Sequence, residues 1–406
     1  MRKQSGFAHV GLFVFAIFIV LAIVGVGLKV RSKSNSKQTG SNTGFIEKLF
    51  NKSDDRNSQE KSWTAGCTNK ERVQMTNLPM NVNDVDTFTP YGLTAGGHVT
   101  PIDHLYFYPK SGPRDKYPVY AMADGFITEI TVRGVNVDSG EKRPPEYRYM
   151  IQHSCQTISY YDLVTKLDQS ILDKYPDAAT KGMSGRFPVK AGQEVGRIGA
   201  QSLDTAVYNM DLTLPGFIHP EMYTAEPWKI HTDDFFSYFN AEHQAQMLAL
   251  SQRKVKPYSG KIDYDQPGKL IGNWFIEGTN GYAGANKYGM GDGTGRGYWS
   301  SHLSVHYHAI NPQNIVVSLG EFKDGDPQAF AVKGNTPDPV GISKDSGVVK
   351  YELTQLPQGQ QSIVSGSVLG VVLFQVLDGE KLKVEIFPDK TAAQVTGFVS
   401  PTTYER

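Results

Sequence analysis

The first residues that could do chemistry together lie near position 100. The segment GGHVTPIDHLYF places His98, Asp103 and His104 at the start of an expected strand. Imidazole and carboxylate groups bind Zn²⁺, and a zinc-bound water becomes a nucleophile near neutral pH. His153 and Asp162 could add two further donors to such a zinc site. The alternative is that these histidines are loop and core residues hydrogen-bonded to neighbouring groups.

A second histidine group occurs in SSHLSVHYHAI, in the other half of the chain. His302, His306 and His308 share parity, so on a strand all three would project from one face. Two or three of them could chelate a metal ion. The alternative is a polar face that packs against its neighbours.

The elements that must position these residues are short β-strands. YPVYAMADGFITEITV, residues 117–132, predicts two strands around an Asp-Gly turn, and FPVKAGQEVGRIGA, residues 187–200, predicts another strand pair. Residues 256–406 alternate short apolar runs with turn signals, including a hairpin at Asp378-Gly379. The pattern favours a mainly β protein with an antiparallel sandwich or barrel in the first half and a second β-rich domain.

In their order, these pieces resemble the lysostaphin-type (LytM-like) zinc endopeptidases that cut peptidoglycan cross-bridges. The resemblance covers about residues 96–214. Its best-matching elements are a strand with an Asp-Gly turn, a glycine hairpin, a strand ending in His, and a Tyr-x-His-Leu position. These are Pro118, Val119, Ala121, Asp124 and Gly125; Val189, Gly192, Gln193, Gly196 and Gly199; His153; and Tyr161-Asp162-Leu163.

The chain differs from this family at the residues that bind zinc and assist catalysis. The family holds zinc with a first His, an Asp and the second His of a closing His-x-His strand, and it uses two further histidines in catalysis. In this chain Val207 and Asn209 fall where the two closing histidines are expected, and Asp162 replaces the other catalytic histidine. Four residues rather than three separate His98 from Asp103. The resemblance therefore implies the family scaffold without its zinc chemistry, and zinc held by relocated ligands is the alternative.

The two cysteines, Cys67 and Cys155, cannot form a four-cysteine zinc site. In an oxidising compartment we expect them to form a disulfide, because Cys155 follows a strand end from which it could reach the N-terminal segment. Two buried free thiols are the alternative.

The N-terminus predicts a membrane location. Residues 10–28 are nineteen consecutive uncharged, mostly apolar residues, long enough to span a bilayer as a helix. We read residues 1–30 as an uncleaved anchor with the globular part outside the cytoplasm. A prepilin-type leader cleaved after Gly6, which would deliver the chain to a filament, is the alternative. Residues 31–66 are polar and predict a flexible linker.

The remaining chain divides into a peptidase-like domain at 67–240, a connecting helix at 241–255 and a β-rich domain at 256–406. Lysine and arginine total 41, and aspartate and glutamate also total 41. The chain therefore has no net positive charge that would attract nucleic acid. By resemblance we expect a cell-envelope protein whose first domain binds peptidoglycan or an envelope partner without catalysis. The alternatives are a zinc endopeptidase and a structural filament protein. The expected contact residues are His98, Asp103, His104, His153, Asp162, Asn209 and Asp211.

Overall fold

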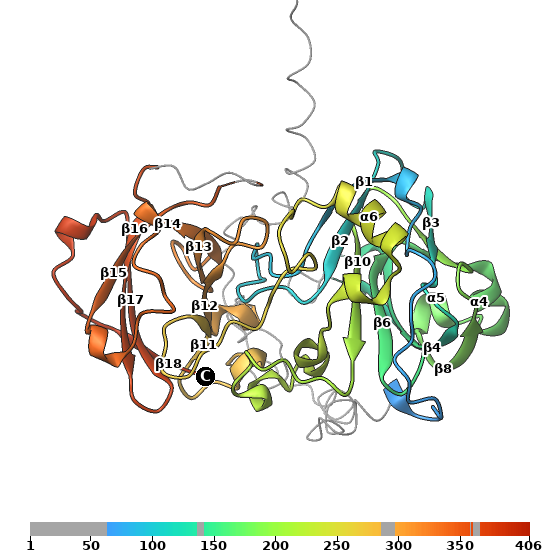
Figure 1. Ribbon diagram of the computed structural model, residues 1–406, viewed down its shortest axis with the longest axis horizontal. Coiled ribbons are helices and arrows are strands. Elements are labelled where there is room, and N and C mark those ends of the chain that lie inside the picture. Colours follow the sequence, from blue (N-terminus) through green and yellow to red (C-terminus); the bar gives the residue numbers. More distant parts are fainter. Residues whose placement is uncertain (1–62, 136–141, 286–296, 358, 360–365) are drawn as a thin grey trace, which may run out of the picture. The chain divides into compact units, whose positions relative to one another are not determined.

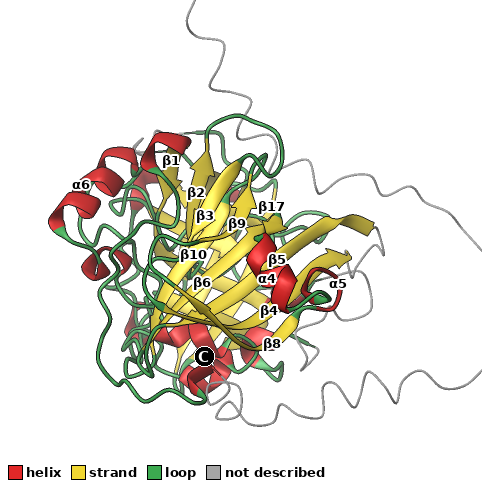
Figure 2. Ribbon diagram, turned by 90° about the vertical axis from the view of Figure 1, so that its right-hand side faces the viewer, coloured by secondary structure: helices red, strands yellow, loops and turns green. Residues whose placement is uncertain are grey.

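The structure, a computed structural model, describes residues 63–135, 142–285, 297–357, 359 and 366–406 (Figure 1). These residues belong to one compact unit, Ser53–Arg406. They are mainly antiparallel β-strands, as the sequence predicted. The α-helices among them are α4 (Gln169–Lys174), α5 (Ala178–Lys181) and α6 (Ala241–Leu250). Figure 2 shows α4 and α5 beside the larger sheet and α6 at its opposite edge.

The apolar stretch at 10–28 lies outside the described residues, so the predicted anchor stays a prediction. Within the described residues, no helix is both long enough and apolar enough to cross a bilayer. The predicted helix at 241–255 is shorter than expected, because Ser251 already has extended backbone angles.

The first half is built on a seven-stranded sheet with the order β1-β2-β10-β6-β5-β4-β8. Every neighbouring pair in it is antiparallel. A smaller sheet has the order β3-β9-β7. The strands are β1 (Val85–Thr89), β2 (Leu105–Pro109), β3 (Tyr117–Tyr120), β4 (Gly125–Val135), β5 (Lys142–Gln152), β6 (Thr157–Val164), β7 (Lys166–Leu167), β8 (Met183–Val189), β9 (Glu194–Ile198) and β10 (Leu203–Asn209).

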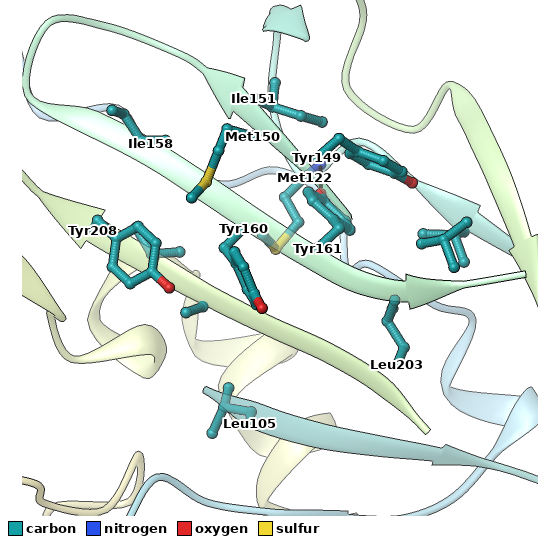
Figure 3. Close-up of a cluster of buried hydrophobic side chains, with 14 of the residues drawn as sticks. Leu105, Met122, Tyr149, Met150, Ile151, Ile158, Tyr160, Tyr161, Leu203 and Tyr208 are labelled. Carbon is teal, nitrogen blue, oxygen red and sulfur yellow. Dashed lines mark hydrogen bonds between the residues drawn. The ribbon is translucent and has the colours of Figure 1, made fainter. Parts of the chain in front are cut away.

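One face of the larger sheet is apolar and packs toward the smaller sheet. Tyr149 and Tyr161 stack there with ring centroids 5.1 Å apart. The Tyr161 hydroxyl donates to the carbonyl of Tyr120 and accepts from the amide of Met122. Figure 3 shows Tyr149 and Tyr161 side by side next to Met122. Because strand residues alternate between faces, the opposite face carries Tyr160.

The second half is a closed barrel of eight antiparallel strands, a sharper result than the β-rich domain expected there. Its interior is apolar, with Trp274 and Leu303 fully buried. The predicted hairpin at Asp378-Gly379 is confirmed between its sixth and seventh strands. The strands are β11 (Gly272–Ile276), β12 (His302–Tyr307), β13 (Ile315–Leu319), β14 (Gln328–Val332), β15 (Val349–Gln355), β16 (Gly370–Leu377), β17 (Lys381–Pro388) and β18 (Thr402–Glu405).

Single turns of 3₁₀-helix complete the described chain. They are η1 (Val82–Asp84), η2 (Pro220–Tyr223), η3 (Pro227–His231), η4 (Phe235–Tyr238), η5 (Gly281–Ala283), η6 (Tyr298–Ser301), η7 (Lys333–Asn335), η8 (Lys344–Ser346) and η9 (Ala392–Gln394).

The two halves of the unit touch through buried polar contacts. The Ser304 hydroxyl donates to the carbonyl of Val99 at 2.7 Å, and the Asn273 amide donates to the Tyr223 hydroxyl at 2.9 Å. The predicted disulfide is confirmed. Cys67 and Cys155 are bonded, which joins the N-terminal segment to the turn between β5 and β6.

Candidate functional site

The polar face of the larger sheet gathers four of the predicted site residues into what we call the polar cluster: His98, Asp103, His104, Asp162 and, in addition, Asp204. Asp103 and His104 lie just before β2, and Asp204 on β10 is directly paired with Asp162 on β6. The ring of His98 lies 5.8 Å from that of His104. The fold therefore brings together residues as far apart in the sequence as His98 and Asp204.

His104 lies between two carboxylates. Its Nδ1 is 3.4 Å from Asp103 Oδ1, and its Nε2 is 3.4 Å from Asp204 Oδ2. Burial lowers the pKa of His104, but the hydrogen bond to Asp103 and the charge of Asp204 outweigh it, so the pKa is raised overall. Burial raises the pKa of Asp204 to about 7, against the opposing charge of His104.

A lysine from η3 enters the polar cluster. The Lys229 side chain is 1% exposed, and its ammonium donates to the carbonyl of Pro101 at 2.7 Å and lies 3.8 Å from Asp103 Oδ1. It also lies 5.3 Å from the ring centroid of Tyr282. Burial raises the pKa of Asp103, but the positive charge of Lys229, together with the hydrogen bond and charge of His104, outweighs it, so the pKa is lowered overall. Tyr208 donates its hydroxyl to the other oxygen of Asp103 at 3.4 Å.

Asp162 is also fully engaged. It accepts hydrogen bonds from Arg133, from Arg148 Nε at 3.0 Å and from the Tyr160 hydroxyl at 2.8 Å. Burial raises the pKa of Asp162, but the charges of Arg148 and Arg133 outweigh it and the pKa is lowered. The Asp162 side chain is 2% exposed, whereas that of Arg133 is 44% exposed. The carboxylate is thus fixed inside, and a guanidinium faces solvent.

The other three predicted contact residues lie apart from this cluster. His153 is held between the carbonyl of Asp124 and the Ser159 hydroxyl, each at 2.8 Å, and burial lowers its pKa to about 4. Asn209 donates to Asp233 at 3.1 Å. The structure does not bring them together with Asp103.

Asp211 is exposed and accepts a hydrogen bond from Gln156 at 3.1 Å. It follows the end of β10, so the sheet does not direct it toward the polar cluster.

Strand alternation also shifts the register expected for β10. Asp204 pairs with Asp162 and Ala206 pairs with Tyr160, so these residues share the polar face. Val207 lies on the opposite, apolar face. The positions that face the polar cluster are therefore Asp204, Ala206 and Tyr208, one residue away from the expected Val207 and Asn209.

The second histidine group does not converge on a common point. His302 Nε2 contacts the carbonyl of Tyr282 at 3.1 Å, and His306 Nδ1 contacts the Ser304 hydroxyl at 3.1 Å. His308 lies beyond the end of β12 and accepts from the amide of Asn311 at 3.2 Å. Burial lowers the pKa of each of the three histidines.

The residues of the polar cluster do not fit a zinc site. Zinc requires three convergent, unprotonated donors. Asp103 is instead paired with an ammonium and a hydroxyl, Asp162 is paired with two guanidinium groups, and both ring nitrogens of His104 face carboxylates. Across the part of the chain that the structure describes, no three His, Cys, Asp or Glu side chains form a group that could hold a metal ion.

Sequence reasoning missed Asp204, Arg133, Arg148 and Lys229. Lys229 had one visible signal. It is the only basic residue in the otherwise apolar run from Pro227 to Ile230. A lysine flanked by Trp228 and Ile230 must bury its ammonium or turn it to solvent, and a nearby carboxylate decides the outcome.

Comparisons with known proteins add little to this geometry. No family model matches the chain, and no curated protein matches it. Among solved structures, the chain is weakly similar to lysostaphin in solution, with 12% identity and a TM-score of 0.25. The alignment covers 66% of this chain and 98% of that chain. Such a score supports no argument about activity or ligand, so the site is interpreted from its own residues.

Proposed function

We propose that this protein is a non-catalytic binding protein of the cell envelope, whose peptidase-like first half recognises peptidoglycan or an envelope protein. The observation that carries the proposal is the pairing of Lys229 with Asp103. An ammonium at this position supplies the positive charge that a divalent cation would supply, but it cannot hold and acidify a water molecule. The pairing of Lys229 with Asp103 therefore balances the buried charge, and it supports a protein that does not hydrolyse its ligand.

The location rests on the disulfide and on the N-terminal sequence. Disulfides persist in oxidising compartments such as the cell exterior, and the Cys67–Cys155 bond suits such a compartment. Residues 10–28 would hold the chain in the membrane, and residues 31–66 would act as the linker to the globular part.

The contact surface would be the exposed edge of the polar cluster. Arg133 and His98 are exposed there, and Arg148 is 29% exposed. Guanidinium groups bind carboxylates and phosphates with good geometry, and both occur in cell-wall polymers. Arg133 is the best single residue to test, because its exposed guanidinium can be changed while Arg148 still pairs with Asp162.

The test is co-sedimentation of the full chain in detergent with purified peptidoglycan, with soluble fragments analysed in the same samples. We expect the wild-type protein to pellet, Arg133→Gln to pellet several-fold less, and no fragments to be released. Lys190→Gln is the matched control, because Lys190 is an exposed cation paired with Asp124 away from the cluster. Failure of the wild-type protein to pellet at every salt concentration would remove peptidoglycan as the ligand. Release of fragments would favour the peptidase alternative.

A further inference from the structure

An open cavity lies away from the polar cluster, and the proposed function does not use it. It has a volume of about 360 Å³ and is formed by α6, by the segment 77–82, by the end of β3 and by the turn at Gly192. Its volume is within the range of small-molecule sites. Residues of the polar cluster do not line it, so its chemistry can be considered separately.

The cavity is lined mainly by amide and hydroxyl groups, with one imidazole. Asn77, Asn81, Tyr120, His243 and Gln246 line it together with three apolar side chains, and no acidic side chain, lysine or arginine contributes. Amide groups both donate and accept hydrogen bonds, and a half-buried tyrosine adds an aromatic face. This lining suits an uncharged ligand rich in hydroxyl or amide groups.

Among the described lining residues, the buried Nδ1 atom of His243 has no hydrogen-bond partner, and two further groups also have unused hydrogen-bonding capacity. Within the described ranges, neither the side-chain amide of Gln246 nor the Tyr120 hydroxyl has an intramolecular hydrogen-bond partner. Neither is a sealed buried group, so both can reach a ligand. They come from α6 and β3, and thus approach the cavity from two separate elements.

The frame around the cavity is held by backbone hydrogen bonds. The amide of Asn77 donates to the carbonyl of Met122 at 3.1 Å, and the amide of Tyr120 donates to the carbonyl of Pro79 at 3.0 Å. Gly192 has a φ of 77°, and a Cβ built on it would lie 3.5 Å from Asn77 Oδ1. Glycine at this turn therefore satisfies the backbone and keeps a side chain out of the cavity.

We propose that this cavity is a saccharide-binding site for a neutral sugar unit that carries hydroxyl and acetamido groups. The lining favours a sugar over a peptide, because five of its eight side chains carry hydrogen-bonding groups. Because no aspartate, glutamate, lysine or arginine lines the site, its affinity should change little with salt, in contrast to binding at the arginine edge. The proposal does not depend on the proposed function of the polar cluster.

The test is titration of the full chain in detergent with the β-1,4-linked tetramer of N-acetylglucosamine, followed by calorimetry or ligand-observed NMR. We expect saturable binding, weakened about tenfold by Gln246→Leu and several-fold by Tyr120→Phe, each with unchanged thermal stability. Glu242→Gln, an exposed change on the same helix outside the cavity lining, should bind as the wild type does. Arg133→Gln should also leave saccharide binding unchanged, which separates this site from the polar cluster.

The proposal is overturned if the tetramer shows no saturable binding, or if Gln246→Leu and Tyr120→Phe both bind it within twofold of the wild type. It is equally overturned if an uncharged tetrapeptide competes for the site and binds more tightly, because that result would assign the cavity to peptides.

Discussion

The ammonium of Lys229 lies 3.8 Å from a carboxylate oxygen of Asp103, with both side chains almost fully buried. Burying two charges is favourable only when they compensate each other and their remaining hydrogen bonds are made. Here Pro101 accepts from the lysine, and Tyr208 donates to the aspartate. The two buried charges of this pair therefore compensate each other, and each keeps a further hydrogen bond.

Removing the lysine should leave an uncompensated buried carboxylate. We expect Lys229→Met to lower the free energy of unfolding by about 3–5 kcal/mol, as for other broken buried pairs. Urea unfolding followed by fluorescence measures the change. Asp103→Asn in the same background should recover part of the loss, because the remaining group is then neutral.

The control for this pair is Lys190→Met, which breaks the exposed contact with Asp124 and should leave stability nearly unchanged. Equal effects of the two lysine substitutions, or strictly additive effects of Lys229→Met and Asp103→Asn, would contradict the charge pairing.

Breaking the disulfide should destabilise the first half. Cys67 and Cys155 are 88 residues apart. A disulfide restricts the unfolded chain, and this typically raises the free energy of unfolding by about 2–4 kcal/mol. We expect the double substitution Cys67→Ser/Cys155→Ser to unfold at clearly lower urea concentration. Reductant should lower the midpoint of the wild type but not that of the double variant. A midpoint unaffected by reductant in both proteins would show that the bond does not contribute.

Asp204 should make stability depend on pH. Its folded pKa of about 7 lies above the ordinary value of 3.8 because the group is buried, so the folded state holds a proton that the unfolded state releases. The resulting stabilisation is complete below pH 3.8 and is lost as the pH rises through 7. The raised pKa of His104 acts in the same direction.

Asparagine at position 204 stays uncharged, so Asp204→Asn should flatten the fall in unfolding free energy between pH 5 and pH 8. Chemical denaturation at several pH values measures the slope. Asp378→Asn, at an exposed carboxylate, should follow the wild-type curve. Parallel curves for Asp204→Asn and the wild type would refute the assignment.

Arg406 should be needed to hold the barrel closed. Its guanidinium donates to the carbonyls of Ile271, Gln266 and Lys269 at 2.6–2.8 Å and lies 4.0 Å from the centre of the Trp274 ring. Loss of several hydrogen bonds from one buried charged group should cost on the order of 3 kcal/mol for Arg406→Met. Lys344→Met, in an exposed pair, is the control, and thermal unfolding is the measurement. Identical melting of the two variants would argue against this role.

The sequence predicted the strands because they depend on local patterns, and it predicted the disulfide because the chain has only two cysteines. Period-two apolar runs and glycine turns near residues 117–132 and 187–200 indicated the sheets, and Cys155 at a strand end indicated the bond with Cys67. Barrel closure could not be predicted, because it depends on the pairing of β18 with both β11 and β17.

The candidate site was predicted only in part, for two physical reasons. Asp103, His104 and Asp162 were found because acid and imidazole groups at strand ends are visible in a sequence. The positions expected on β10, Val207 and Asn209, lie one residue away from those that face the polar cluster. A one-residue shift moves every side chain to the other face of a sheet. Lys229 was missed because its partner is 126 residues away, and only the fold brings the two charges together.

The most direct test of the central claim is the zinc content of the full chain after incubation with excess zinc and exhaustive dialysis, measured by mass spectrometry of the metal. The lysine–aspartate pairing predicts far less than one zinc ion per chain, with the same value in Asp103→Asn. One zinc ion per wild-type chain, lost in Asp103→Asn, would mean that the carboxylate binds metal, and it would contradict the lysine–aspartate pairing.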